Sequence, residues 1–175
     1  MSKSNRCVIS GTDIYRLPFG FNEDSRECQK VKTRLLHAIT ALHKNGVDEF
    51  YTDCGLGFPL WGGEIVTGLM NYNNVKLFVC FPYEDQPYKY AENWRERFFK
   101  VHELCTEVFP IYVKFDDENK NFDFSDENEE ELVRRGADYM LEKCGKMLFG
   151  GDGDGLYIYD EARKRGLEIY TLEMV

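Results

Sequence analysis

The alternation of short apolar runs with longer helix-like segments constrains the fold of this chain more than any other feature of its sequence. The runs are rich in β-branched and aromatic residues and are short enough to be strands. The predicted strands are Arg6 to Ser10, Phe50 to Thr52, Val75 to Phe81, Val108 to Val113, Lys146 to Gly150 and Leu167 to Leu172. Because a helical segment separates each strand from the next, we expect them to form a parallel sheet.

Helical segments fill the intervals between the strands. In the first, Ser25 to Lys44, apolar residues recur at helical spacing, and Asn45-Gly46 supplies a typical C-terminal stop. Further helices are predicted over Pro59 to Met70, Ala91 to Leu104, Glu127 to Lys143 and Leu156 to Arg165. A length of 175 residues suits one domain better than two, so we predict a single α/β domain over residues 1–175 with a sheet of about six strands.

The charge balance disfavours several classes of partner. The chain has 22 basic and 31 acidic residues, a net charge of -9, which repels DNA, RNA and anionic lipid surfaces. Nucleic acid is therefore an unfavourable partner. The apolar run after MSKSNR is only CVIS, which forms neither a signal peptide nor a membrane span, so we expect no membrane partner.

The cysteines and histidines indicate a reducing compartment and no metal site. Six cysteines, at positions 7, 28, 54, 80, 105 and 144, form no CxxC pair and lie mostly in apolar runs. This pattern is typical of reduced thiols and predicts a cytoplasmic protein. His37, His43 and His102 neither form an HxxxH pair nor cluster with cysteines, so no metal site is predicted.

The acidic tract at residues 116–132, DDENKNFDFSDENEEEL, has two interpretations. It could be an interaction tail. However, Asp126 and Glu129 fit a capping box, and acidic residues favour a helix N-terminus. We interpret the tract as a polar loop that leads into a solvated helix start.

A glycine elbow follows the second strand in the stretch TDCGLGFPLWGGE, Thr52 to Glu64. A helix N-terminus offers unpaired N–H groups and a positive dipole end, and glycines allow a phosphate to approach them. Gly55, Gly57 and Pro59 fit this role. The spacing matches neither GxGxxG nor GxxxxGK[ST], so a plain strand-to-helix turn is an equal alternative.

A second elbow, Phe149-Gly-Gly-Asp-Gly-Asp-Gly155, would lie at the same carboxyl edge of the sheet, where open α/β folds bind ligands. Asp152 and Asp154 would repel a bare anion unless they point away or a cation bridges them. We predict no cofactor, with Mg²⁺ entering only if Asp152 and Asp154 face a bound phosphate. A solvated turn is the simpler interpretation.

Two side chains of the first elbow are candidates for chemistry. Glu64 could accept hydrogen bonds from sugar hydroxyls or act as a nucleophile or base, or it could be an ordinary helix-surface residue. The helix dipole could lower the pKa of the Cys54 thiol, but no histidine is adjacent to act as its base. A buried thiol is therefore the favoured interpretation of Cys54.

An aromatic segment, Phe81 to Tyr90, follows the third strand and is too polar and proline-rich for a core. It is predicted to be a loop whose rings could stack on a base, while the arginines of the next helix meet phosphate. Trp94 falls on a helical stripe with Phe98 and Val101, which predicts a core position for it.

Several segments carry motifs of one known family. The segment Ser10 to Glu23 is similar to TGHRPxxLPxGxDE, and Thr52 to Glu64 is similar to SGMALGVDLWAAE without a gap. A third motif, a strand that ends in proline and glutamine and is followed by tryptophan and arginine, is similar to Phe81 to Gln86 with Trp94 and Arg97. A fourth, GGT before a helix, corresponds to Gly153 to Gly155. Together they resemble the YpsA/YoqJ-like branch of the SLOG superfamily, the group that also includes LOG and Smf/DprA proteins.

This resemblance implies a Rossmann-like parallel sheet with helices on both faces and a nucleotide or nucleotide-sugar pocket at the strand C-termini. The leading hypothesis is a cytosolic protein that binds an ADP-ribose-like ligand. Glu64 would receive ribose hydroxyls, and Gly55 and Gly57 would present N–H groups to phosphate. The expected ligand-binding residues are Ser10, Gly11, Thr12, Arg16, Cys54, Gly55, Leu56, Gly57, Glu64, Arg97, Gly150, Gly151, Gly153 and Gly155.

Other functions stay open at this point. The chain could cleave an N-glycosidic bond as a nucleoside monophosphate hydrolase or transferase, with Glu64 catalytic and Asp13 or Asp154 as the acid. It could also be a protein-interaction or nucleic-acid-handling module, although its charge argues against DNA. Exposed aromatic residues, Phe19 and Phe21, are candidates for a homodimer interface.

Overall fold

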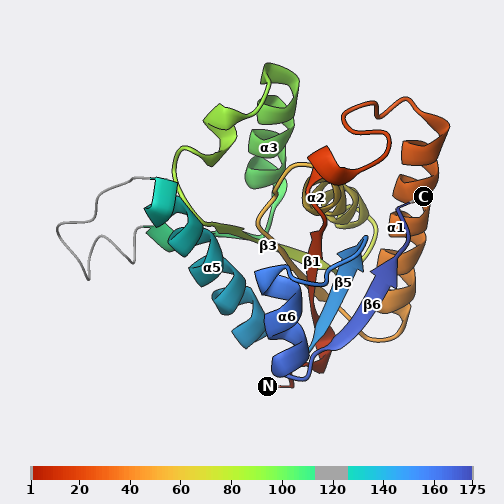
Figure 1. Cartoon of the computed structure of the whole chain (residues 1–175). Helices are drawn as coiled ribbons and strands as arrows, with labels where there is room; N and C mark the ends of the chain where they lie inside the picture. Colours follow the sequence, from red (N-terminus) through yellow and green to blue (C-terminus); the bar gives the residue numbers. More distant parts are fainter. Residues whose placement is uncertain (1, 113–125, 175) are drawn as a thin grey trace.

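A six-stranded parallel sheet forms the centre of the molecule (Figure 1). The structure is a computed structural model that describes residues 2–112 and 126–174. The strands are β1 (Arg6–Gly11), β2 (Glu49–Thr52), β3 (Lys76–Phe81), β4 (Glu107–Pro110), β5 (Lys146–Gly150) and β6 (Glu168–Leu172). Their order is β4-β3-β2-β1-β5-β6, which confirms the predicted α/β class.

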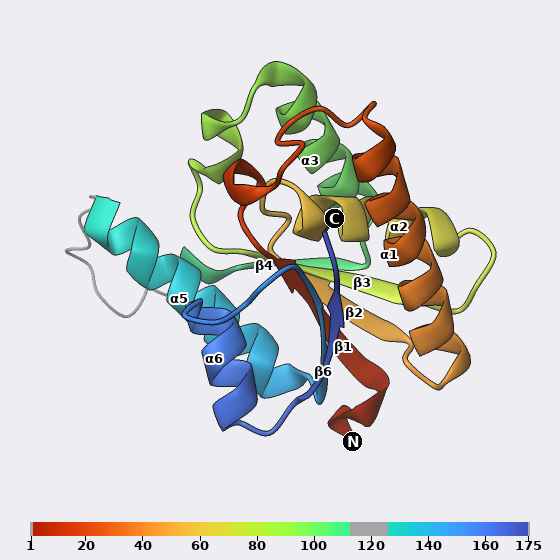
Figure 2. The same ribbon diagram turned by 45° about the vertical axis from the view of Figure 1, so that its right-hand side comes forward.

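Helices cover both faces of this sheet (Figure 2). One face carries α1 (Arg26–Lys44), α2 (Phe58–Leu69) and α3 (Glu92–Leu104), and the other carries α5 (Asp126–Lys143) and α6 (Tyr157–Lys164). The chain builds β1 to β4 outward in one direction and then returns to place β5 on the other side of β1. The strand order therefore reverses beside β1, and in open α/β sheets ligands bind at such a switch point.

Local sequence signals explain where α1 begins and ends. The Ser25 side chain accepts a hydrogen bond from the Cys28 N–H at 3.1 Å, so it caps the helix start. The helix buries one apolar face against the sheet, and Gly46 follows its end with a φ of 95°. A left-handed residue after the last turn is the usual place for glycine.

One predicted strand differs from the structure, and a second predicted segment lies largely outside the described residues. The strand predicted over Val108 to Val113 is shorter, because β4 ends at Pro110 and the next two residues turn into helical geometry. The acidic tract lies outside the described residues as far as residue 125, and so does the proposed capping by the Asp126 side chain. The other predicted strands and helices end within about two residues of the observed bounds.

Close packing fixes the N-terminus of α2 over the switch point. Gly11 and Gly150 are paired in register at the ends of β1 and β5. A Cβ atom on Gly150 would lie 2.4 Å from the Phe58 ring, and one on Gly62 would lie 2.6 Å from Ile9. Because both strand ends lack side chains, Phe58 packs directly on the backbone there and α2 lies tight against β1.

The structure bears on two further expectations. All six cysteines are free, and all but Cys105 are buried. Among the described residues, no helix is both long and apolar enough to cross a bilayer.

Candidate functional site

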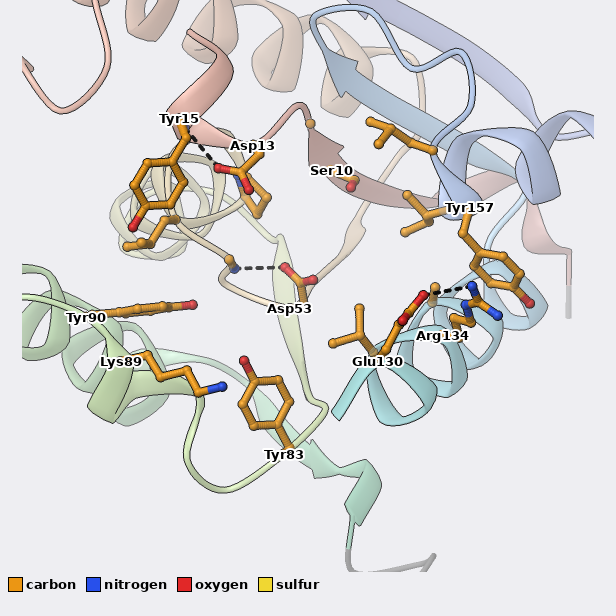
Figure 3. Close-up of a pocket in the computed structure, with 18 of the residues that line it drawn as sticks. Ser10, Asp13, Tyr15, Asp53, Tyr83, Lys89, Tyr90, Glu130, Arg134 and Tyr157 are labelled. Atoms are coloured by element: carbon orange, nitrogen blue, oxygen red, sulfur yellow. Dashed lines mark hydrogen bonds and ion pairs between the residues drawn. The ribbon is translucent and has the colours of Figure 1, made fainter. Parts of the chain in front are cut away.

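A cavity of about 680 Å³ lies at the carboxyl edge of the sheet, over the switch point (Figure 3). Its walls come from the end of β1, the elbow after β2, the loop after β3, and helices α5 and α6. Cavities of this size hold small molecules. The lining residues that the sequence analysis expected are Ser10, Gly11, Gly55, Leu56 and Gly155.

Asp53, directly after β2, is a lining residue that the sequence analysis did not select. Its Oδ1 accepts a hydrogen bond from the Gly55 N–H at 2.8 Å. Among the described residues, no side chain donates a hydrogen bond to this carboxylate and no cation pairs with it. Burial raises its pKa, although the backbone hydrogen bond opposes this effect.

Asp13 lines the cavity from the loop after β1. Its Oδ1 accepts a hydrogen bond from the Tyr15 N–H at 2.9 Å and thereby caps the short 3₁₀ helix η2 (Ile14–Arg16). Tyr15 also lines the cavity, whereas Ile14 is fully buried and anchors the loop. A carboxylate and an aromatic ring are thus held together at this rim.

The loop after β3 forms an aromatic wall, as the sequence led us to expect of its polar, ring-rich composition. Tyr83, Lys89 and Tyr90 all line the cavity. Burial raises the pKa of both tyrosines, so their phenol groups stay neutral. Lys89 pairs with Glu129 and lies 5.4 Å from the centre of the Tyr83 ring. Trp94, in contrast, is buried in the core as predicted.

The start of α6 forms the opposite end of the cavity. Gly155 has a φ of 81°, and no side chain caps the helix. Its first N–H groups, at Tyr157 and Ile158, therefore have no partner within the helix, and both residues line the cavity. The Arg134 guanidinium of α5 lies 5.3 Å from the Tyr157 ring centre. The same guanidinium forms an ion pair with Glu130, with a nitrogen-to-oxygen distance of 2.8 Å. A positive helix end and a cation meet here.

The first elbow offers fewer N–H groups than expected. The Gly55 N–H is already bonded to Asp53, and Pro59 has no N–H. Gly57, which has a φ of 90°, is buried behind Ile14 and does not line the cavity. The geometry therefore does not support the phosphate-binding role that we expected of Gly55 and Gly57.

The chain matches a family model over residues 7–173. The model is YpsA, described as the YspA SLOG family, and it spans nearly the whole sequence. This protein belongs to that SLOG family. No curated protein sequence matches the chain. Membership confirms the predicted resemblance and is consistent with a nucleotide-related role, either ligand binding or cleavage of a glycosidic bond.

The SLOG-like motif held the signal for Asp53. In its gapless match to SGMALGVDLWAAE, Asp53 stands where the motif has glycine, and Pro59 stands where the motif has aspartate. An acid in place of a glycine at a strand end indicates a candidate site residue, because its carboxylate lies at the carboxyl edge of the sheet.

Glu64 and Arg97 of this SLOG protein lie outside the cavity lining, in a group that we call the Arg97 cluster: Arg97, Glu64, Glu23, Lys32 and Trp61. Arg97 donates to both oxygens of Glu64, at 2.6 and 2.7 Å, and also pairs with Glu23. Trp61 and Lys32 reach Glu23 at 2.6 Å each. Glu64 therefore does not line this cavity, because α2 turns it toward α1 and α3.

Strong pairing changes the ionisation of the Arg97 cluster. Burial alone would raise the pKa of Glu23, but hydrogen bonds from Arg97 and Lys32 outweigh it and lower that pKa. Burial likewise opposes the charge of Arg97, yet the two carboxylates raise its pKa. Both shifts favour the charged forms of Glu23 and Arg97, and the cluster joins the loop after β1 to three helices.

Several other expected residues also lie outside the lining. The Thr12 hydroxyl donates to the Asp152 carbonyl at 3.1 Å, and Arg16 is exposed on η2. Burial raises the pKa of Cys54 well above its ordinary value, which fits the buried-thiol interpretation. The remaining three residues are glycines that pack against other side chains: Gly150 against Phe58, Gly151 against Thr12 and Gly153 against Tyr159.

The acidic residues of the second elbow do not line the cavity either. Asp154 pairs with Arg163 at 3.2 Å, and Asp152 accepts a hydrogen bond from the Asp154 N–H at 3.1 Å. Among the residues that the structure describes, no group of three or more His, Cys, Asp or Glu side chains is placed to hold a metal ion.

Proposed function

We propose that this SLOG protein binds a nucleotide or nucleotide-sugar, such as an ADP-ribose-like molecule, in the cavity over the switch point. The observation that supports this best is the convergence of an uncapped helix N-terminus and an arginine at one end with tyrosine rings at the other. Helix N-termini and arginine favour phosphate, whereas aromatic rings favour a base.

In this proposal the phosphate binds at the second elbow. Gly155 allows close approach to the N–H groups of Tyr157 and Ile158, and Arg134 supplies a positive charge. Asp152 and Asp154 do not line the cavity and leave room for an anion. The base packs against Tyr83 and Tyr90 at the aromatic wall. The protein's net charge of -9 makes these local positive groups necessary.

The geometry favours binding over the cleavage mechanism in which Glu64 is catalytic. Both oxygens of Glu64 are held by Arg97, outside the cavity lining. Of the two proposed acids, Asp13 lines the cavity and Asp154 does not. Release of free base from nucleoside monophosphates that is lost in Glu64→Gln would favour the enzyme instead.

Calorimetry tests the proposal directly. ADP-ribose, cyclic ADP-ribose, AMP and NAD are titrated into the protein, and native mass spectrometry of the purified protein detects any retained nucleotide. We expect binding by at least one ligand and about tenfold weaker binding by Arg134→Met, because a charge-assisted contact is lost. Arg163→Met, on the same side of the sheet but outside the cavity, is the matched control. No heat at high micromolar folded protein would contradict the proposal.

A further inference from the structure

Asp53 lines the cavity but has no part in the proposed binding of phosphate and base. Its side chain lies near the middle of the cavity, between Tyr83 and Tyr90 on one side and Tyr157 and Arg134 on the other (Figure 3). It follows β2 directly and is therefore carried by the rigid sheet edge rather than by a long loop.

Two contacts hold Asp53 in place. The Gly55 N–H donates to its Oδ1 at 2.8 Å, and the buried Gln86 side chain donates to its main-chain carbonyl at 2.9 Å. No cation among the described residues neutralises it, and no side chain donates to it. A fixed carboxylate that faces a cavity and has only backbone donors among the described residues can accept further hydrogen bonds from a ligand.

The position of Asp53 indicates which part of a ligand donates these bonds. A carboxylate without a cation repels phosphate, so the phosphate belongs at the α6 end, where Arg134 neutralises Glu130 and the helix N-terminus is positive. The base belongs at the tyrosine wall. In every nucleotide the sugar lies between base and phosphate, and Asp53 lies between the corresponding walls of the cavity. The donors nearest to it are therefore sugar hydroxyl groups.

We propose that Asp53 recognises the 2′- and 3′-hydroxyl groups of a ribose, so that the cavity selects ribonucleotide-derived ligands over their 2′-deoxy counterparts. This inference rests on the proposed function, because it assigns one part of the same ligand. A carboxylate with two acceptor oxygens suits a vicinal diol, and a site built to bind a hydroxyl rejects the analogue that lacks it.

The test compares ribose and deoxyribose forms of the same ligands. Calorimetry measures Kd for AMP and 2′-deoxy-AMP and for ADP-ribose and 2′-deoxy-ADP-ribose, with wild type, Asp53→Asn and the control Asp154→Asn. We expect wild type and Asp154→Asn to prefer the ribose form at least tenfold. Asp53→Asn should weaken the ribose form about tenfold and leave the deoxy form within about threefold, so the preference disappears.

The outcomes separate the two proposals. If no member of either pair binds, the proposed function fails for these ligands and the inference fails with it. If ribose and deoxyribose forms bind equally to wild type, only the role of Asp53 is overturned. Equal weakening of both forms by Asp53→Asn also overturns it. The wild-type comparison needs no variant, so it stands even if Asp53→Asn folds poorly.

A pH series adds an independent measurement. The carboxylate must be ionised to accept two hydroxyl donors, and burial raises its pKa. The ribose preference of wild type should therefore fall as the pH is lowered through the raised pKa of Asp53, whereas Asp53→Asn should show no such trend. The other charged groups that line the cavity, Asp13, Glu130, Lys89 and Arg134, are common to both proteins and cancel in the comparison.

Discussion

Two carboxylates of one short stretch, Thr52 to Glu64, differ in their pairing with cations. Glu64, in α2, shares Arg97 with Glu23 in a network of close ion pairs. Asp53, at the start of the same stretch, faces the cavity without a cation among the described residues. The pKa of Glu23, the other carboxylate paired with Arg97, is lowered, whereas the pKa of Asp53 is raised.

This difference in pairing predicts different roles for the two carboxylates. A partly buried carboxylate that is paired with a cation destabilises the folded state when that cation is removed. One without a cation weakens it, unless something outside the chain supplies donors. The Arg97 cluster is thus expected to act in stability, and Asp53 in ligand recognition.

Removal of the shared cation should have the largest effect on stability. Arg97→Met leaves Glu23 and Glu64 charged and partly buried, so we expect the free energy of unfolding to fall by about 3 kcal/mol. Urea denaturation at pH 7 measures it. Arg163→Met removes a more exposed ion pair and should change stability by less than about 0.5 kcal/mol. Equally small losses of unfolding free energy in the two variants would contradict a stabilising role for the Arg97 cluster.

Neutralisation of Glu23 should have a smaller and pH-dependent effect. Its folded pKa is lowered, so its stabilisation is complete above its ordinary pKa of 4.5 and is lost as the pH falls through the folded pKa. We expect Glu23→Gln to cost about 1.5 kcal/mol at pH 7 and progressively less below pH 4.5. Urea denaturation across this range checks the trend, and a loss that is independent of pH would contradict it.

Neutralisation of Asp53 should have the smallest effect and the opposite sign. Its folded pKa is raised, so ionisation weakens the fold at neutral pH, and protonation removes this penalty in acid. Asp53→Asn should gain about 0.5 kcal/mol at pH 7, because an amide oxygen can still accept the Gly55 N–H. The gain should shrink as the pH falls through the raised pKa. A loss of stability at pH 7 would show that the Asp53 charge stabilises the fold.

Local patterns were sufficient for the parallel sheet and for most element boundaries. Apolar runs, helical spacing and the Asn45-Gly46 stop depend on neighbouring residues alone, so they are visible in one sequence. The expectation that both elbows lie at the carboxyl edge also follows from strand direction. The β4 prediction failed because an apolar run does not reveal where strand pairing ends.

Which side chains come into contact depends on how distant elements pack. Glu64 was expected at the ligand, but the rotation of α2 brings it to Arg97, a residue 33 positions away. Asp53 could not be selected from the sequence, because whether a cation lies beside it depends on elements that are distant in the sequence. The approach of Arg134 to Tyr157 likewise depends on how α5 packs beside α6. Sequence spacing determines which face of an element a residue occupies, whereas partners depend on distant elements that share no local pattern with it.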